Sequence, residues 1–102
     1  MKNYVYLYYN KGTREGVSPE QSKQEWGAWF GGLGDKLVDA GNPFGDGKAV
    51  SKDGTMDVKG MPATGYSIVK ADSMSDATKM ADDCPVLDEP EGAVCVYETL
   101  PM

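Results

Sequence analysis

Residues 65–73, with the sequence GYSIVKADS, decide the fold because they hold a strand and the start of a helix. β-Branched and aromatic side chains dominate residues 66–70 and predict the strand. Ser73 lies three residues before Asp76, which is the spacing of a helix N-cap. Small and apolar side chains then recur at helical spacing and predict the buried side of a helix: Ala77, Met80, Ala81 and Cys84. Pro85 is expected to end that helix.

Two further strands are expected near the ends of the chain. Residues 4–9 (YVYLYY) stop at the turn signal Asn10-Lys11-Gly12, and residues 93–99 alternate in side-chain character. Alternation puts the tyrosines of the first strand on one face and its aliphatic residues on the other. We expect the helices to cover the face that holds Val5, Leu7, Ile68, Val94 and Val96. The opposite face would then present Tyr4, Tyr6, Tyr8, Ser67, Val69, Cys95 and Tyr97.

A long helix is predicted to begin after Ser18, which can cap it, with Pro19 in the first position and Gln21 completing a capping box. Gly41 is expected to end this helix. Its apolar stripe consists of Trp26, Phe30, Leu33 and Leu37. Glycines at positions 27, 31, 32 and 34 interrupt it, and each costs about 1 kcal/mol relative to alanine. We expect close packing of the backbone against the sheet or a partner to offset that cost.

A hairpin is predicted between residues 48–51 and 56–59, because Asp53-Gly54 is a strong turn signal. The elements follow the order β-α-β-β-α-β, which is the split βαβ plan of the ferredoxin-like fold. No repeat or linker divides the chain. We therefore expect a single α+β domain over residues 1–102.

Composition excludes several classes of function. Ten Lys and Arg against sixteen Asp and Glu give a net charge of −6 over 102 residues. Nucleic-acid binding needs clustered cations, and the cations here are scattered, so we expect neither a nucleic-acid partner nor a membrane partner. The chain contains no histidine, which removes His-based triads and HExxH metal sites.

Cysteine usage and the N-terminal residues indicate a cellular compartment. Cys84 and Cys95 cannot close a tetrahedral zinc site unless Asp, Glu or a second chain supplies ligands, so no metal is expected. Residues 1–10 lack the long apolar core and the cleavage site of a signal peptide. No stretch approaches transmembrane length. We expect a cytoplasmic protein whose thiols are reduced and buried.

A set of segments carries a resemblance to a known family. The most specific is the Ala71-Asp72-Ser73 step into the second helix, followed by Cys84-Pro85 and a final strand. The other segments are residues 26–30 (WGAWF), 37–43 (LVDAGNP), 65–70 (GYSIVK), 77–85 and 94–98 (VCVYE). In this order and spacing, and over most of the chain, they resemble the YCII-related proteins of the dimeric α/β-barrel superfamily.

The resemblance implies a four-stranded antiparallel sheet with both helices on one face. The other face would meet a second copy in a two-fold, barrel-like homodimer that encloses a cavity. A tyrosine-rich sheet face suits such an interface or pocket. Some relatives are proposed to use a His–Asp pair in the cleft. Because this chain has no histidine, that chemistry is not expected here.

Several residues are candidates for a site. Without histidine, acid–base work falls to Asp, Glu, Lys or Tyr, and Asp35, beside Gly34, is the candidate catalytic residue. In the alternative interpretation, Asp35 is a solvated charge on the helix with no catalytic role. The candidate ligand-binding residues are Tyr6, Tyr8, Trp29, Asn42 and Ser67. Tyr6 and Tyr8 could donate hydrogen bonds to a ligand, or they could pack in an interface. Trp29 and its neighbour Trp26 could offer a stacking surface for a planar ligand, or they could be buried in the core or an interface.

Two interpretations of function follow. The first is a small dimeric module that binds a small molecule or serves as a structural partner. The second is a cofactor-independent enzyme that uses an acidic residue and tyrosines in the dimer cleft. The enzyme needs an acid or base with a shifted pKa that faces a closed pocket, whereas the binding module needs only the cavity. No cofactor is implied by either interpretation.

Overall fold

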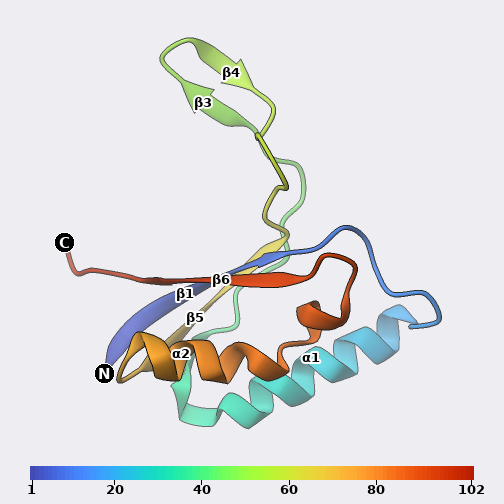
Figure 1. The fold of residues 1–102 in the computed structure, drawn as a ribbon, viewed down its shortest axis with the longest axis vertical. Helices are drawn as coiled ribbons and strands as arrows, with labels where there is room; N and C mark the ends of the chain where they lie inside the picture. The colour runs from blue at the N-terminus through green and yellow to red at the C-terminus, as the bar shows by residue number, and fades with distance from the viewer.

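Four strands make one antiparallel sheet in the order β2-β5-β1-β6 in the computed structural model, which describes residues 1–102. They are β1 (Lys2–Tyr9), β2 (Leu37–Asp39), β5 (Gly65–Ala71) and β6 (Ala93–Glu98). Helices α1 (Pro19–Leu33) and α2 (Met74–Met80) lie together on one side of the sheet (Figure 1). The chain is therefore an α+β protein whose architecture is compatible with the ferredoxin-like fold.

Both helices begin where the sequence predicts. The Ser18 hydroxyl accepts a hydrogen bond from the backbone N–H of Gln21 at 3.1 Å, and Ser73 accepts one from Asp76 at the same distance. Each cap satisfies a backbone donor that the first turn leaves free. Short 3-10 turns extend both helices: η1 (Gly34–Lys36) after α1, and η2 (Ala81–Asp83) and η3 (Pro85–Asp88) after α2. The proline at position 85 thus begins η3, and α2 ends earlier than predicted.

The prediction that α1 runs to Gly41 is wrong. The helix stops at Leu33 because Gly34 takes a φ of 56° and its N–H bonds back to the Gly31 carbonyl. Leu37, which was placed on the helix stripe, opens the edge strand β2 instead and pairs with Val69 of β5. A cluster of glycines, which are poor helix formers, precedes this break.

The glycines of α1 also have a different environment from the one predicted. A Cβ atom added at Gly27, Gly31 or Gly32 would meet no other group within 4 Å. No sheet or helix backbone therefore packs closely against them. They lie on the open side of the helix, and their cost in helix propensity is not offset by any contact within the chain.

The two faces of the sheet are exchanged for β1 and β5 relative to the prediction. Tyr4, Tyr6 and Tyr8 point into the helix layer and are at most 5% exposed. Ser67 and Val69 of β5 are buried with them, and Val94 and Val96 of β6 pack against the same core. Val5, Leu7 and Ile68 lie on the other face, where Cys95 and Tyr97 were correctly placed.

Size matching and hydrogen bonding explain why the tyrosines face the helices. The helix α2 and the η2 turn present small buried residues, Ala77 and Ala81, so large side chains are needed to fill the space above the sheet. The Tyr6 hydroxyl donates a hydrogen bond to the Ala77 carbonyl. Trp29 of α1 packs on Tyr6 with ring centroids 6.0 Å apart, and its indole N–H donates to the Met80 carbonyl at 3.2 Å.

The face of the sheet away from the helices is called the free face below. Its side chains are Val5, Leu7, Tyr9, Tyr66, Ile68, Cys95 and Tyr97. All but Tyr97 are half-buried, and Tyr97 is 56% exposed. No helix covers this face (Figure 1). Cys95 is therefore partly accessible, unlike the buried thiol that was predicted, whereas Cys84 is buried as expected.

A hairpin forms in the predicted region but does not join the sheet, and its second strand, predicted at residues 56–59, lies at residues 54–56. Strands β3 (Ala49–Ser51) and β4 (Gly54–Met56) pair only with each other, around the turn at Lys52-Asp53. Residues 45–63, which we call the arm, extend away from the sheet on the side opposite the helices (Figure 1). The radius of gyration is 14.7 Å, against about 13 Å for a compact domain of this length.

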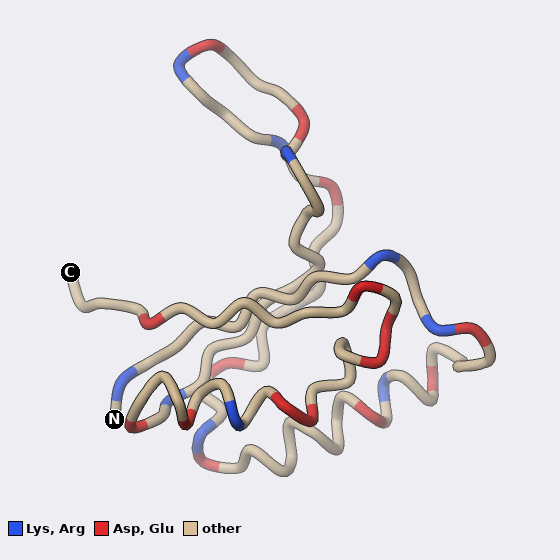
Figure 2. Tube along the Cα trace, viewed as in Figure 1, with Lys and Arg blue, Asp and Glu red and all other residues tan.

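Charged residues of both signs are distributed along the whole chain (Figure 2). The arm holds three lysines (48, 52 and 59) and three aspartates (46, 53 and 57), so it is neutral as a whole. The net charge of −6 therefore belongs to the rest of the chain. Neither α1 nor α2 has the length and apolar character that crossing a bilayer requires.

Candidate functional site

A cleft of about 510 Å³ lies beside the helix layer at the end of β1. We call it the Tyr8 cleft. Its walls come from α1, from the loop after β1, and from the two segments that lead into and out of the arm. The residues that line it are Tyr8, Asn10, Thr13, Ser22, Lys23, Trp26, Phe30, Ala40, Gly41, Asn42, Pro43, Thr64, Gly65, Tyr66, Val86 and Glu89. Its volume falls in the range of small-molecule sites.

Tyr8 is held in place by a chain of hydrogen bonds. Its hydroxyl donates to Ser67 Oγ at 2.7 Å, and Ser67 Oγ donates to the Ala40 carbonyl at 2.6 Å. Burial raises the pKa of Tyr8 well above its ordinary value, and the bond to Ser67 offsets only part of that rise. Tyr8 therefore keeps its proton at neutral pH and has no role as a base.

Aromatic rings form one wall of the cleft. Trp26 of α1 meets Tyr8 edge to face, with ring centroids 4.9 Å apart, and Phe30 lies 5.7 Å from Trp26 one turn further along the helix. Trp29 packs behind them, 5.8 Å from Trp26 and 6.4 Å from Tyr8. Such offset and perpendicular arrangements stabilise ring clusters beyond simple burial. The wall is therefore a fixed aromatic surface.

Neutral polar groups face this wall. Thr64 Oγ1 donates to Asn10 Oδ1 at 2.7 Å, and the Thr64 N–H donates to the Tyr8 carbonyl at 2.7 Å. These bonds extend the pairing of β1 and β5 beyond the ends of both strands. Asn42 lines the neighbouring segment, and its backbone carbonyl accepts from the Tyr66 N–H at 3.4 Å.

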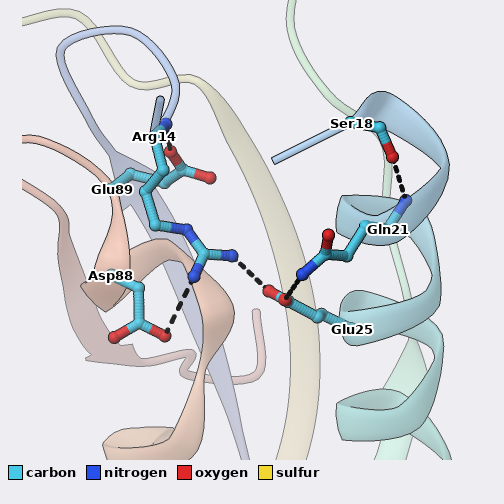
Figure 3. A network of polar contacts seen from close by, with 6 residues as sticks. All are labelled: Arg14, Ser18, Gln21, Glu25, Asp88 and Glu89. Carbon is cyan, nitrogen blue, oxygen red and sulfur yellow. Dashed lines mark hydrogen bonds and ion pairs between the residues drawn. The ribbon is translucent and has the colours of Figure 1, made fainter. Parts of the chain in front are cut away.

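The Arg14 side chain ties the loop after β1 to α1 and to η3 (Figure 3). Its guanidinium pairs with Glu25 of α1 and lies 4.0 Å from Asp88 of η3. The Arg14 backbone N–H donates to Glu89 Oε2 at 2.5 Å. Gln21 also donates to Glu25, at 3.3 Å. The carboxylate of Glu89 is thus engaged by the loop, and Lys23 is the other charged residue of the lining.

The structure brings together some of the predicted site residues. Tyr8 and Asn42 line the cleft, and Ser67 accepts a hydrogen bond from the Tyr8 hydroxyl. Trp29 supports the aromatic wall without lining the cleft. Tyr6 lies in the core with its hydroxyl on Ala77, and burial, with a smaller contribution from Cys84, raises its pKa to about 12.

Asp35 lies apart from this site. It is an exposed residue of the η1 turn after α1 and does not line the cleft. Its position matches the alternative interpretation of a solvated charge.

Sequence reasoning missed several lining residues. Trp26 and Phe30 were assigned to an apolar stripe, whose spacing is the same for a core and for a pocket wall. Asn10 directly follows β1, and Thr64 directly precedes β5. Because these two strands pair with each other, their pairing could have predicted that both residues lie at the same end of the sheet. Two other clefts, of about 600 and 640 Å³, lie over the loop of residues 13–23 and along the groove between α1 and α2. Neither contains Tyr8.

No family model matches the chain, and no curated protein or solved structure compared with it matches either.

Proposed function

We propose that the chain is a small-molecule-binding module that acts as a homodimer of ferredoxin-like subunits, in keeping with its resemblance to the YCII-related proteins. The observation that carries the proposal is the Tyr8 cleft: an aromatic wall opposite neutral polar groups, within one subunit. Few, well-placed polar groups in an apolar pocket are typical of ligand sites.

The lining points to a class of ligand. Trp26 and Phe30 offer ring surfaces on which a planar group can stack. The uncharged polar groups are amides and hydroxyls, Glu89 is already bonded to the Arg14 backbone, and Lys23 is exposed. A charged ligand would find no buried counter-charge. We therefore propose a neutral, ring-bearing molecule with one or two hydrogen-bonding groups.

The free face supports the homodimer. Its side chains are aliphatic or aromatic at most positions, and only the ends of the strands hold charged residues such as Lys70. Contiguous apolar patches of this kind mark interaction sites on soluble proteins. Burying this face against the same face of a second copy is the two-fold arrangement that the family resemblance implies.

A binding experiment tests the ligand site. Neutral phenol and indole fragments are titrated into ¹⁵N-labelled protein, and the amide shifts are mapped. We expect shifts at Asn10, Asn42, Thr64 and Gly65, and a loss of these shifts in Ser22→Trp, whose indole fills the cleft. Gln24→Trp adds the same ring to an exposed position of α1 outside the cleft and is expected to bind the fragments normally.

Two results of this titration would contradict the proposed ligand site. If Ser22→Trp binds the fragments as well as Gln24→Trp does, or if no fragment shifts the lining amides, the cleft is not a ligand site. A structural role for the dimer would then be the better interpretation.

A further inference from the structure

We infer that the arm (residues 45–63) docks on a second copy of this chain and completes the homodimer. The inference rests on the dimer of the proposed function and goes beyond the pairing of sheet faces, since it assigns a role to a segment whose two strands pair only with each other. It concerns protein association and is independent of the ligand in the Tyr8 cleft.

The direction of the arm is the first argument. The helices lie on one side of the sheet, and the arm extends from the opposite side (Figure 1). That is the side of the free face. A second copy that packs on the free face occupies the space beside the arm, so the arm runs along that copy rather than into solvent.

The second argument is that the hairpin lacks support of its own. Strands β3 and β4 have three residues each and pair only with each other. A two-stranded hairpin in water is marginally stable at best. The one ion pair across it, Lys48 with Asp57 at 2.6 Å, is exposed on both sides, and such pairs contribute little. Packing against another surface would supply the missing stabilisation.

Apolar surface continues from the free face into the arm. Tyr66 of the free face stacks on Phe44, with ring centroids 5.8 Å apart and planes 20° apart, and Phe44 is 45% exposed. Val58 and Val50 follow within the arm and are 42% and 79% exposed. The arm is also neutral, so its approach to a second, negatively charged copy meets no net repulsion. These features fit an occupant that is the chain itself.

Interface area is the fourth argument. A face of four strands, each about six residues long, covers on the order of 400 Å² in projection, given the strand spacing and the rise per residue. A stable interface of ordinary size buries about 800 Å² of accessible surface on each partner. Side-chain relief makes the accessible area of a face larger than its projection, so the free face alone approaches the ordinary interface size without exceeding it; the average of six residues already includes the three of β2. An arm laid along the partner adds to that area.

Photo-crosslinking tests the contact directly. Benzoylphenylalanine is placed at Val50, in the arm, and as a matched control at Gln24 on α1. Equal amounts of ¹⁴N and ¹⁵N protein are mixed and irradiated. We expect position 50 to give crosslinked dimers of mixed isotope content and position 24 to give none. Crosslinks from position 50 that stay within one chain would overturn the inference, because they would show the arm folded over its own subunit.

Sedimentation equilibrium separates this inference from the dimer itself. We expect Val50→Asp with Val58→Asp to raise the dimer dissociation constant at least tenfold, and replacement of residues 47–60 by a short Gly-Ser turn to do the same. Lys52→Ala, at the tip, is expected to leave it unchanged. Leu7→Glu, on the free face, is expected to abolish the dimer.

The possible results point to different failures. If both arm variants dimerise as tightly as the unaltered chain while Leu7→Glu is monomeric, the arm inference is wrong and the sheet-face dimer stands. If the unaltered chain is itself monomeric at micromolar concentration, the arm inference and the proposed dimer fail together. The fragment titration reports on the ligand site in either case.

Discussion

Single residues buried in the core set the chemistry of this protein. Tyr6, Tyr8 and Cys84 are each at most 5% exposed, and burial is the largest cause of the raised pKa of all three. A buried group resists ionisation because its charged form loses hydration. These hydroxyls and this thiol therefore act as neutral hydrogen-bonding and packing groups over the physiological range.

Cys84 gives a prediction about alkaline pH. Burial raises its pKa from 9.0 to about 12, so the folded state holds the proton more tightly than the unfolded state does. The corresponding stability is fully present below pH 9 and is lost as the pH rises towards 12. We expect the free energy of unfolding to fall by roughly 1 kcal/mol between pH 9 and 10 through this group, measured by urea denaturation at fixed protein concentration.

Tyr6 and Tyr8, whose unfolded pKa is 10.0, also begin to contribute between pH 9 and 10, so variants of the cysteines are needed to identify the share of the thiol. Cys84→Ala should be less stable at neutral pH but should show a shallower decline in this window, whereas Cys95→Ala should keep the slope of the unaltered chain. An unchanged slope in Cys84→Ala would show that the thiol is not the group responsible.

At the scale of elements, α1 combines a well-defined start with a weakened second half. Its cap at Ser18 and its buried stripe are both in place. Gly27, Gly31 and Gly32 have open space where a Cβ would lie. No close contact within the chain therefore offsets the conformational entropy that these glycines lose in the helix. The early end at Leu33 frees residues 37–39 for the edge strand β2.

Gly31→Ala should therefore stabilise the protein by about 0.5–1 kcal/mol, because alanine restricts the unfolded chain and clashes with nothing in the fold. Ala28→Gly, at another exposed position of α1, should lower the stability by a similar amount. Thermal and urea unfolding measure both changes. A loss of stability in Gly31→Ala would mean that another molecule contacts the backbone there.

Gly41 stands in contrast to the helix glycines. It joins β2 to the base of the arm with a φ of 73°, and a Cβ there would lie 1.8 Å from the Tyr66 carbonyl oxygen. We expect Gly41→Ala to lower the free energy of unfolding by at least about 2 kcal/mol, from the left-handed backbone and the clash together. Gly45→Ala, which meets nothing within 4 Å, is the control. Equal stabilities for the two variants would contradict this account.

At the scale of the whole molecule, the subunit has a one-sided core. Thirteen of the 102 residues are buried, and they lie between the sheet and the helices, while the apolar free face and the arm have no cover within the chain. The Tyr8 cleft is built partly from the segments at the base of the arm. Docking of a second copy would therefore also hold two walls of the cleft.

Cys95 reports on the free face. If the proposed dimer forms, a second copy covers the free face, and we expect iodoacetamide to modify Cys95 at least ten times faster in Leu7→Glu than in the unaltered chain. Cys84, which is 2% exposed in the subunit, should stay protected in both. Peptide mass spectrometry after timed labelling gives the rates.

A matched variant keeps the charge change constant. Gln24→Glu adds the same side chain and the same single negative charge to the exposed surface of α1 and should keep the slow labelling of the dimer. Equal labelling rates of Cys95 in Leu7→Glu and in the unaltered chain would argue against the sheet-face interface.

Local signals made much of the fold predictable. The serine caps at 18 and 73 depend on neighbouring residues, and the structure contains both. A hairpin also forms where Asp53-Gly54 predicted a turn, although the turn is Lys52-Asp53 and Gly54 begins β4. Tyr8 and Asn42 were candidates for the site, and both line the cleft. Phe30 was not a candidate, and Trp26 was weighed as core or interface packing against a stacking surface for a planar ligand, because a stripe at helical spacing does not show whether it faces a core or a cavity.

The sequence by itself determined the starts of both helices, the strands at residues 2–9, 65–71 and 93–98 and the α+β class, because caps, turns and periodicity act over a few residues. It did not predict the edge strand β2, which lies where a helix was expected. Only the tertiary structure decided which side of β1 faces the helices. Both sides are apolar, and the choice depends on the fit of Tyr6 over Ala77 and of Tyr8 onto Ser67, at sequence separations of 71 and 59 residues. The cleft and the free face follow from that choice, since contacts between distant segments carry no signature in either segment alone.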